Sequence, residues 1–296
     1  MNKHVMAVLA AGCLWGTMGF FTRTLATLGI NAEGAILVRC AMAALCFAVL
    51  ILVTDRSAFR IRLKDFWCFF GSGVCALLFF TWCYFHSINL MSLSAAAILL
   101  YTAPTIVMLL SAVFFRERIT PIKLAALVLA FAGCALVSGV GGGESLTLRG
   151  VLFGLGSGLG YALYSIFARF ALNRGYSSTT VNLYSCLLAA IGAALIFGWR
   201  DTFAAASASW GSALFCLLAG AVTCFLPYYF YTYGLTGLET GKASILASVE
   251  PVIATLIGIL IYHETMSVPA GIGVLLVLSA VVLLNHIPKE RVQGSS

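Results

Sequence analysis

Apolar residues fill most of the chain in long runs that short polar stretches separate. About 20 apolar residues are needed to cross the roughly 30 Å hydrocarbon core of a bilayer. Ten runs approach that length, and the fifth is the shortest. They lie at about 5–25, 33–53, 66–88, 92–115, 122–140, 150–171, 178–199, 211–233, 243–262 and 268–286. The pattern predicts an all-α polytopic membrane protein with ten transmembrane helices.

Composition excludes a water-soluble fold. Hydrophobic residues make up 61% of the 296 residues and charged residues 9%, and the mean hydropathy is +1.04. A soluble domain carries about 25% charged residues, far more than this chain has for its surface. Lys3 and the apolar stretch after it resemble a signal peptide, but we interpret residues 1–25 as the first span because nothing that follows requires secretion.

The formal net charge of +7 is explained by membrane topology. With a cytoplasmic N-terminus, three Lys or Arg residues fall outside and one, Arg39, lies within a helix. Thirteen fall inside: Lys3, Arg56, Arg60, Arg62, Lys64, Arg116, Arg118, Lys123, Arg169, Arg174, Lys242, Lys289 and Arg291. This is the positive-inside bias. It favours a bacterial cytoplasmic-membrane protein with both termini cytoplasmic, and it argues against a nucleic-acid partner.

The sequence lacks the short motifs that mark metal, nucleotide-binding and nucleophilic catalytic sites. The ten cysteines lie in apolar segments without C-x-x-C spacing, which is typical of small buried hydrophobic residues. Phosphate-loop, dinucleotide-binding and nucleophile-elbow patterns are absent, and the histidines are scattered. We therefore expect no cofactor, no metal and no enzymatic activity.

An internal repeat is the most informative feature. At an offset of 147, ILLYTAPTIVMLLSAVFFRE (98–117) aligns with ILASVEPVIATLIGILIYHE (245–264), matching Pro104 with Pro251 and Glu117 with Glu264. At an offset of 146, GCLWGTMGFFTR (12–23) aligns with GLGYALYSIFAR (158–169). The chain thus divides into repeats at 1–145 and 146–290. Five helices in each force the second to lie inverted, which is typical of secondary transporters.

These segments resemble a known family. LWG in the first span, TAPTIVMLLSAVFFRERIT in the fourth and SVEPVIATLIGILIYHE in the ninth are similar to the two EamA-type domains of the drug/metabolite transporter superfamily. The resemblance covers almost the whole chain. It implies ten helices related by an inverted pseudo-two-fold axis, a central cavity, alternating access, and a small metabolite or amino-acid-like solute that is commonly exported.

Glu250 is the first candidate for solute chemistry. It lies about 10 Å inside the bilayer, where a lipid-exposed carboxylate costs about 2.5–3.5 kcal/mol, so it should face the bundle or a wet cavity. It could bind a cationic group of the solute, couple transport to protons, or be a structural glutamate. Its neighbour Pro251 and the repeated Pro104 remove backbone hydrogen bonds, and we interpret both as kinks that shape gating.

Other polar and aromatic residues lie within the spans. Arg39 could hold a solute carboxylate, pair with Glu250, or extend to the outer interface. Tyr228, Tyr231, Trp82 and Tyr84 are assigned in part to the interfacial aromatic belts. Aromatic residues at mid-depth could line a cavity or simply pack. The remaining substrate-binding candidates are Trp15, Tyr101, Tyr161, Tyr164, Tyr184 and Asn182.

The sequence therefore predicts a secondary active transporter whose partners are a small-molecule solute and the surrounding membrane lipid. An amino acid or related, aromatic compound is the first solute class, with export as the expected direction and proton coupling as an option. Alternatives are a carrier of organic cations such as quaternary amines, a passive facilitator, or an intramembrane lipid-modifying enzyme. The oligomeric state is left open.

Overall fold

The computed structural model describes residues 2–139, 147–263 and 265–285, apart from the side chains of Leu93 and Ser94. The expected boundary between the repeats at 145/146 and the repeat partner Glu264 lie outside these residues. Within the described ranges, every regular element is helical. The longer helices are α1 (Lys3–Gly16), α2 (Met18–Thr27), α3 (Ala32–Thr54), α5 (Phe79–Leu90), α6 (Leu93–Leu100), α7 (Ala103–Phe115), α8 (Pro121–Val137), α9 (Leu148–Asn173), α10 (Ser178–Phe197), α12 (Trp210–Gly220), α13 (Leu226–Leu235), α14 (Thr240–Ala247), α15 (Glu250–Tyr262) and α16 (Val268–Asn285).

The ten predicted spans are confirmed. In the described part of the chain, nine helical stretches are long and apolar enough to cross a membrane, and α8 is a shorter apolar helix. At 1.5 Å per residue, the 17 residues of α8 extend about 25 Å. In chain order, spans 1 to 10 are Lys3–Thr27, Ala32–Thr54, Leu63–Leu90, Ala95–Phe115, Pro121–Val137, Leu148–Asn173, Ser178–Phe197, Trp210–Leu235, Thr240–Tyr262 and Val268–Asn285.

Spans 4 and 9 are interrupted at equivalent points. α6 ends at Leu100 and α7 begins at Ala103, while α14 ends at Ala247 and α15 begins at Glu250. In each case a proline occupies the first turn of the second helix, where its missing N–H costs nothing. The prolines therefore start new helices after a break, instead of bending one continuous helix.

Other irregularities repeat with the same spacing. Spans 4 and 9 end at Arg116 and His263, which both have a left-handed backbone with φ of 55°. Spans 3 and 8 each contain a π-helical segment, η3 (Gly71–Leu78) and η4 (Ala221–Phe225). These shared breaks and caps show that the two halves have the same architecture. Span 1 departs from it, because Thr17 separates α1 from α2 whereas α9 in span 6 is continuous.

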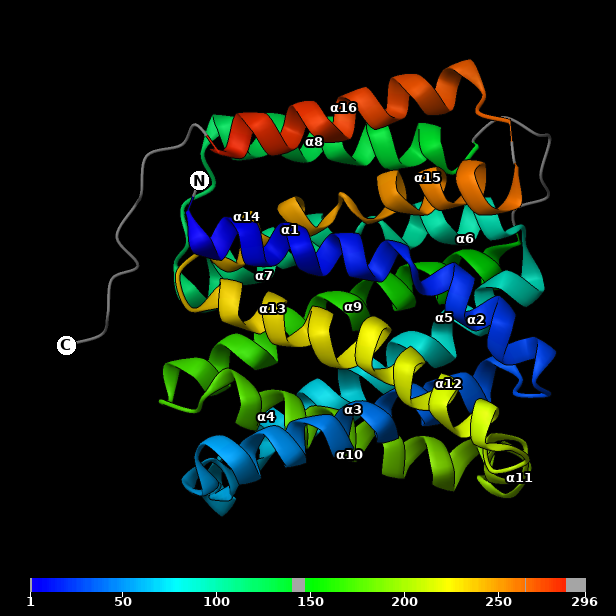
Figure 1. The fold of residues 1–296 in the computed structure, drawn as a ribbon. Helices are drawn as coiled ribbons and strands as arrows, with labels where there is room; N and C mark the ends of the chain where they lie inside the picture. Colours follow the sequence, from blue (N-terminus) through cyan, green and yellow to red (C-terminus); the bar gives the residue numbers. More distant parts are fainter. Residues whose placement is uncertain (1, 140–146, 264, 286–296) are drawn as a thin grey trace.

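The halves are interleaved, so that each span packs against a partner from the other half. α3 packs on α10, α7 on α14 and α8 on α16, while α1 packs on α13 and α5 on α9. Figure 1 shows the α8–α16 pair at one edge of the bundle and the α3–α10 pair at the opposite edge. This exchange of partners is the pseudo-two-fold arrangement that the inverted repeat predicts.

Glycines bring span 1 close to the break in span 9. A Cβ atom on Gly12 would lie 2.6 Å from Val249 Cγ1, and one on Gly16 would lie 2.7 Å from the Glu250 carbonyl oxygen. In span 6, a Cβ atom on the equivalent Gly158 would lie 2.7 Å from Thr102 Oγ1 at the break in span 4. Small residues thus let α1 and α9 lie close against the two interrupted spans.

Candidate functional site

An aromatic cluster occupies the centre of the bundle. Trp15 of α1 lies with its ring centroid 6.1 Å from Tyr161, 5.2 Å from Tyr228 and 5.4 Å from Tyr231. Tyr164 of α9 is 4.7 Å from Tyr228. These rings line a cavity between spans 1, 3, 6 and 8 whose free volume is about 10 Å³. That space holds about one water molecule, so the cavity is almost closed in this conformation.

Hydrogen bonds between buried polar side chains hold the aromatic cluster in place. The Tyr164 hydroxyl donates to Asn182 Oδ1, and Asn182 Nδ2 donates to the Tyr228 carbonyl at 3.1 Å. On the other side, the hydroxyls of Ser165 and Tyr231 are 2.7 Å apart. Asn182 is fully buried, and its amide joins spans 6, 7 and 8. The network holds Tyr164 and Tyr228 in fixed orientations beside Trp15.

Glu250 is the first residue of α15, directly after the break in span 9. It lies within electrostatic range of Arg39 and of the hydroxyls of Tyr84, Tyr101 and Tyr161. Among the described residues, none forms a hydrogen bond or ion pair with its carboxylate, whereas every buried side-chain nitrogen and oxygen atom has a partner. The unpaired carboxylate therefore faces space that water can enter, next to the aromatic cluster.

Arg39 of α3 is held inside the bundle. Its Nε donates to Thr223 Oγ1 at 2.8 Å and its Nη2 donates to the Thr223 carbonyl at 3.0 Å. Thr223 belongs to η4, and a π-helical segment leaves backbone carbonyls available to such donors. The expectation that Arg39 could extend to the outer interface is therefore wrong, because its guanidinium instead joins span 2 to span 8.

The other predicted residues lie in two places. Tyr101 is in the break of span 4 and packs against a buried cluster that includes Val249 and Val252 of span 9. Tyr184 lies away from the aromatic cluster, because its hydroxyl donates to the Phe59 carbonyl at 2.6 Å at the end of the bundle. Pro104 and Pro251 are buried at the two breaks. The structure thus groups Trp15, Tyr161, Tyr164 and Asn182, with Glu250 and Tyr101 alongside.

The prediction that Tyr228 and Tyr231 lie in part in an interfacial belt is wrong. Tyr228 is 9% exposed and Tyr231 is 1% exposed, and both contact Trp15. Their spacing of three residues places them on one face of α13, which packs on α1. That spacing was visible in the sequence, but the identity of the helix facing it was not.

The two halves are joined by a buried polar network at one end of the bundle. This is the end at which α1 begins and α16 ends, on the left of Figure 1, and we call it the basic end. Glu117 Oε1 and Oε2 accept from the backbone N–H groups of Thr240 and Gly241 at 2.6 and 3.0 Å. Arg169 donates to Thr240 Oγ1 at 2.9 Å and to the Leu238 carbonyl. The carboxylate thereby caps the start of α14, where the helix dipole favours a negative charge.

An ion pair extends this basic-end network. Lys123 Nζ is 2.5 Å from Glu239 Oε2, and it donates to the Arg118 carbonyl at 2.7 Å. Lys123 is 3% exposed and Arg169 is 5% exposed. Buried charges require partners, and those of Glu117 and Lys123 come from the second half, whereas the partners of Arg169 lie in its own half. The network therefore joins the two halves at the basic end.

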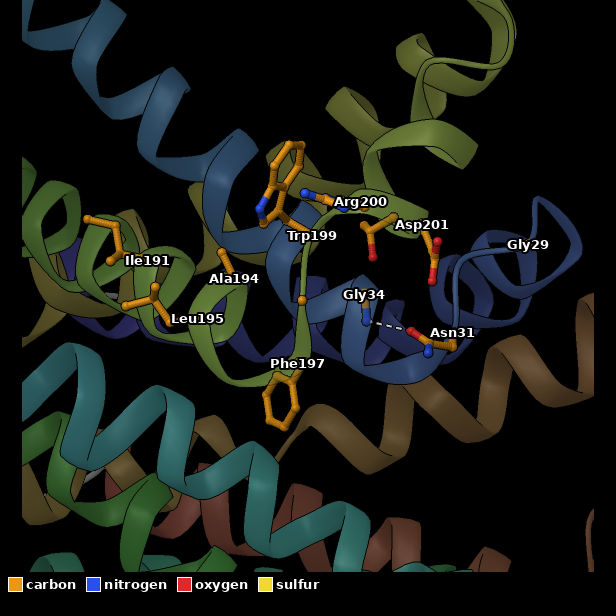
Figure 2. Close-up of a pocket in the computed structure, with 12 residues that line it drawn as sticks. Gly29, Asn31, Gly34, Ile191, Ala194, Leu195, Phe197, Trp199, Arg200 and Asp201 are labelled. Atoms are coloured by element: carbon orange, nitrogen blue, oxygen red, sulfur yellow. Dashed lines mark hydrogen bonds between the residues drawn. The ribbon is translucent and has the colours of Figure 1, made fainter.

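Another cavity lies away from this centre. It has a volume of about 590 Å³ and lies at the opposite end, between the start of α3 and the turn after α10. Figure 2 shows Trp199, Arg200 and Asp201 around it, with the Asn31 side chain accepting a hydrogen bond from the Gly34 N–H. Its lining is peripheral to the pseudo-two-fold axis, so we place the candidate site at the aromatic cluster.

Metal ligands do not gather in the described residues, where groups of three or more His, Cys, Asp and Glu side chains with suitable geometry are absent. The cysteines of this part of the chain are free thiols, and seven are buried: Cys40, Cys68, Cys83, Cys134, Cys186, Cys216 and Cys224. They pack as small apolar side chains.

Comparison with known proteins gives one family. The model of the EamA-like transporter family matches residues 2–139 and 148–286, which are the two repeats. An uncharacterized transporter of Archaeoglobus fulgidus is 30% identical over 68% of this chain and 70% of its own length. The uncharacterized inner membrane transporter YicL of Salmonella typhimurium is 25% identical over 99% of both chains.

The fold has also been seen in a crystal structure. A protein of 18% sequence identity superposes with a TM-score of 0.79 over 95% of both chains. At this identity the likeness concerns the fold alone.

Proposed function

Because the chain belongs to the EamA-like transporter family, we propose that this membrane transporter is a secondary active carrier that moves a small metabolite by alternating access. The solute binds at the aromatic cluster of Trp15, Tyr161 and Tyr228, beside Glu250. One observation carries the proposal: an unpaired carboxylate lies next to a nearly closed aromatic cavity at the break of an inverted repeat. Broken helices at a repeat interface are where transporters of this design bind their solutes.

For alternating access, the basic-end network is proposed to close the path between the cluster and the basic end in this conformation. The basic-end network must open for solute to pass from the cluster to that side, while the close glycine contacts of spans 1 and 6 hold each broken helix against its neighbour. The basic end faces the cytoplasm according to the positive-inside rule, in the inner membrane of a bacterial cell. Export is the expected direction, in which solute enters when the network is open and leaves when it is closed.

An amino acid or related compound is the first solute class. Its ammonium group pairs with Glu250, its aromatic or apolar side chain lies among the tyrosines, and its carboxylate turns towards Arg39. A quaternary amine is the second class, since a cation among aromatic faces beside a carboxylate is a favourable arrangement. These classes differ in whether binding depends on Arg39.

A thermal-shift screen of the purified protein against amino acids, amines and quaternary ammonium compounds tests the binding role. A ligand at 100 times its dissociation constant stabilises the folded state by about 2.7 kcal/mol. We expect a hit that is lost in Glu250→Gln. Loss also in Arg39→Gln, but not in Thr223→Val, indicates an amino acid, because the second variant keeps the guanidinium. No stabilisation by any compound of these classes contradicts the proposed solutes.

Counterflow in proteoliposomes tests the carrier. Solute on the trans side accelerates uptake by a carrier but not by a passive facilitator that forms an open path. A lipid-modifying enzyme would give neither counterflow nor solute-dependent stabilisation. Proton coupling is measured in the same vesicles, as uptake driven by an imposed pH gradient that Glu250→Gln abolishes.

A further inference from the structure

A second cavity lies at the basic end, outside the central cluster and the basic-end network. It has a volume of about 390 Å³ and lies between the end of α3, the start of span 3 and the turn that joins α9 to α10. Three arginines line it: Arg60, Arg62 and Arg174. Asp55 is the acidic residue of the same lining. The cavity is therefore rich in guanidinium groups and lies at the level where the spans leave the bilayer.

The inverted repeat supplies an internal comparison. At an offset of 146, Gly29 and Asn31 of the cavity in Figure 2 correspond to Gly175 and Ser177 of this one. Both glycines have a left-handed backbone, with φ of 82° and 85°. The architecture of the two cavities is thus shared, but their charge is not. The cavity in Figure 2 contains Arg200 next to Asp201, which balance each other.

The arginines are held in place but still have N–H donors available to a ligand. Arg174 Nε lies 3.1 Å from Asp65 Oδ1, and Arg62 Nε lies 3.5 Å from Asp65 Oδ2. Asp65 is 5% exposed, so it anchors both guanidinium groups from the interior of the protein. Within the described part of the chain, the Arg60 side chain has neither a hydrogen bond nor an ion pair, and only its backbone N–H is bonded, to the Ser57 carbonyl at 2.9 Å. Guanidinium groups fixed in this way present several N–H donors to a phosphate.

An apolar surface continues from the cavity. The Arg174 guanidinium lies 4.8 Å from the centroid of the Trp67 ring. Trp67 is 41% exposed, and its neighbours Phe66 and Phe70 are 39% and 44% exposed. These rings belong to span 3 and are partly exposed at its outer surface, where the acyl chains of the bilayer lie, and the Trp67 ring also contacts Phe170 of span 6. A ligand that bridges cavity and surface therefore has an anionic head and an apolar body.

We propose that this cavity binds the phosphate headgroup of an anionic phospholipid from the leaflet at the basic end. The phosphate is held by Arg60, Arg62 and Arg174, and an acyl chain lies along Phe66, Trp67 and Phe70. The positive-inside rule accounts for the positive charge of the arginines. It does not require that they line a cavity with exposed aromatic rings beside it. Basic pockets between spans are known to bind anionic headgroups.

Native mass spectrometry of the detergent-purified full-length protein tests this site. The probes are phosphatidylglycerol, phosphatidylcholine and soluble glycerol 3-phosphate. We expect phosphatidylglycerol to bind in preference to phosphatidylcholine, and Arg60→Gln to weaken its binding about fivefold, the effect of one arginine near an anionic headgroup. The matched variant Arg200→Gln, in the cavity of Figure 2, should leave binding unchanged.

The Arg60 side chain is exposed and unpartnered in the described residues, so Arg60→Gln should unfold at the wild-type temperature without lipid, and this is measured first. The double variant Arg60→Gln with Arg62→Gln should lose still more affinity. Equal binding of the two lipids, or equal loss in Arg60→Gln and Arg200→Gln, would overturn the proposal. Displacement of phosphatidylglycerol by an equal concentration of glycerol 3-phosphate would also overturn it, and would assign the cavity to a soluble phosphate.

Discussion

Glu250 has no counterpart in the first repeat, where Ala103 occupies the equivalent position. Both residues begin the second helix of a broken span, so the shared architecture does not require a carboxylate there. A buried charge that the fold does not need is a cost to stability unless it is paired or reaches water. The unpaired state of Glu250 in the described residues therefore favours a role in binding solute or protons over a role in folding.

Replacing Glu250 by glutamine tests that role. Removing one partner of a buried charge pair costs about 3–5 kcal/mol, which corresponds to an affinity loss of about 100-fold or more. We expect Glu250→Gln to express normally and to lose proton-coupled or cation transport, measured as solute uptake into proteoliposomes. The matched variant Glu33→Gln changes an exposed carboxylate and should transport normally. Wild-type kinetics in Glu250→Gln would remove this residue from the mechanism.

At the scale of the helices, each broken span lies in close contact with a glycine of a neighbouring span. Gly12 of span 1 lies against the break of span 9, and Gly158 of span 6 lies against the break of span 4. A Cβ atom on Gly12 would also lie 2.9 Å from the Ala247 carbonyl oxygen, which is backbone and moves only with its helix. The close approach therefore fixes where each broken span can lie.

Alanine substitutions at two glycines of span 1 test this contact. Overpacking a close helix contact costs about 1–3 kcal/mol, so Gly12→Ala should lower the thermal unfolding midpoint of the purified protein. Gly19→Ala is the control, because nothing lies within 4 Å of the Cβ atom it adds. It should leave the midpoint unchanged or raise it slightly, since alanine restricts the unfolded chain. Equal midpoints for the two variants would show that the contact at Gly12 does not limit stability.

The sequence predicts where the spans and their breaks lie along the chain better than it predicts which helices pack against one another. Length and hydropathy placed the spans because lipid imposes both, and Pro104 and Pro251 marked the two breaks because proline ends a backbone ladder. The π-helical segments in spans 3 and 8 have no comparable residue signal. The contacts of Tyr228 and Tyr231 with Trp15, and of Arg39 with Thr223, depend on which helix lies opposite. That information is tertiary, and hydrophobic periodicity does not contain it.

At the scale of the whole molecule, the basic-end network is a buried polar connection between the halves. Its charges are buried and shared, so the conformation with this end closed depends on both Lys123 and Glu239. The repeat does not reproduce this ion pair at the other end, where the equivalent positions are Ala270 and Ser92. The closed basic end is therefore stabilised by an interaction that the opposite end lacks.

Glu239→Gln should shift the molecule towards a conformation open at the basic end. It leaves the Lys123 ammonium without its carboxylate, and a shift of 1.4 kcal/mol changes a population tenfold. The readout is labelling of Leu77→Cys, at the central cavity, by a membrane-impermeant thiol reagent applied to the basic side. We expect about tenfold faster labelling than in the same cysteine variant with Glu239 intact. An unchanged rate would mean that the ion pair does not control this opening, and Glu33→Gln serves as a charge-matched control.

The inverted repeat makes a specific prediction about membrane orientation. The loop after span 4 and its repeat equivalent after span 9 have the same place in the fold, yet five intervening spans put them on opposite sides of the bilayer. Ile119 and Met266 are exposed loop residues of similar size, at 44% and 54%. In intact cells, an impermeant thiol reagent should label Met266→Cys and not Ile119→Cys, and inverted vesicles should give the reverse. The native cysteines give a low background because each is buried or partly buried. Labelling of both variants from one side would contradict the inverted repeat, whereas a simple exchange of sides would keep the repeat and reverse the assignment of the basic end to the cytoplasm.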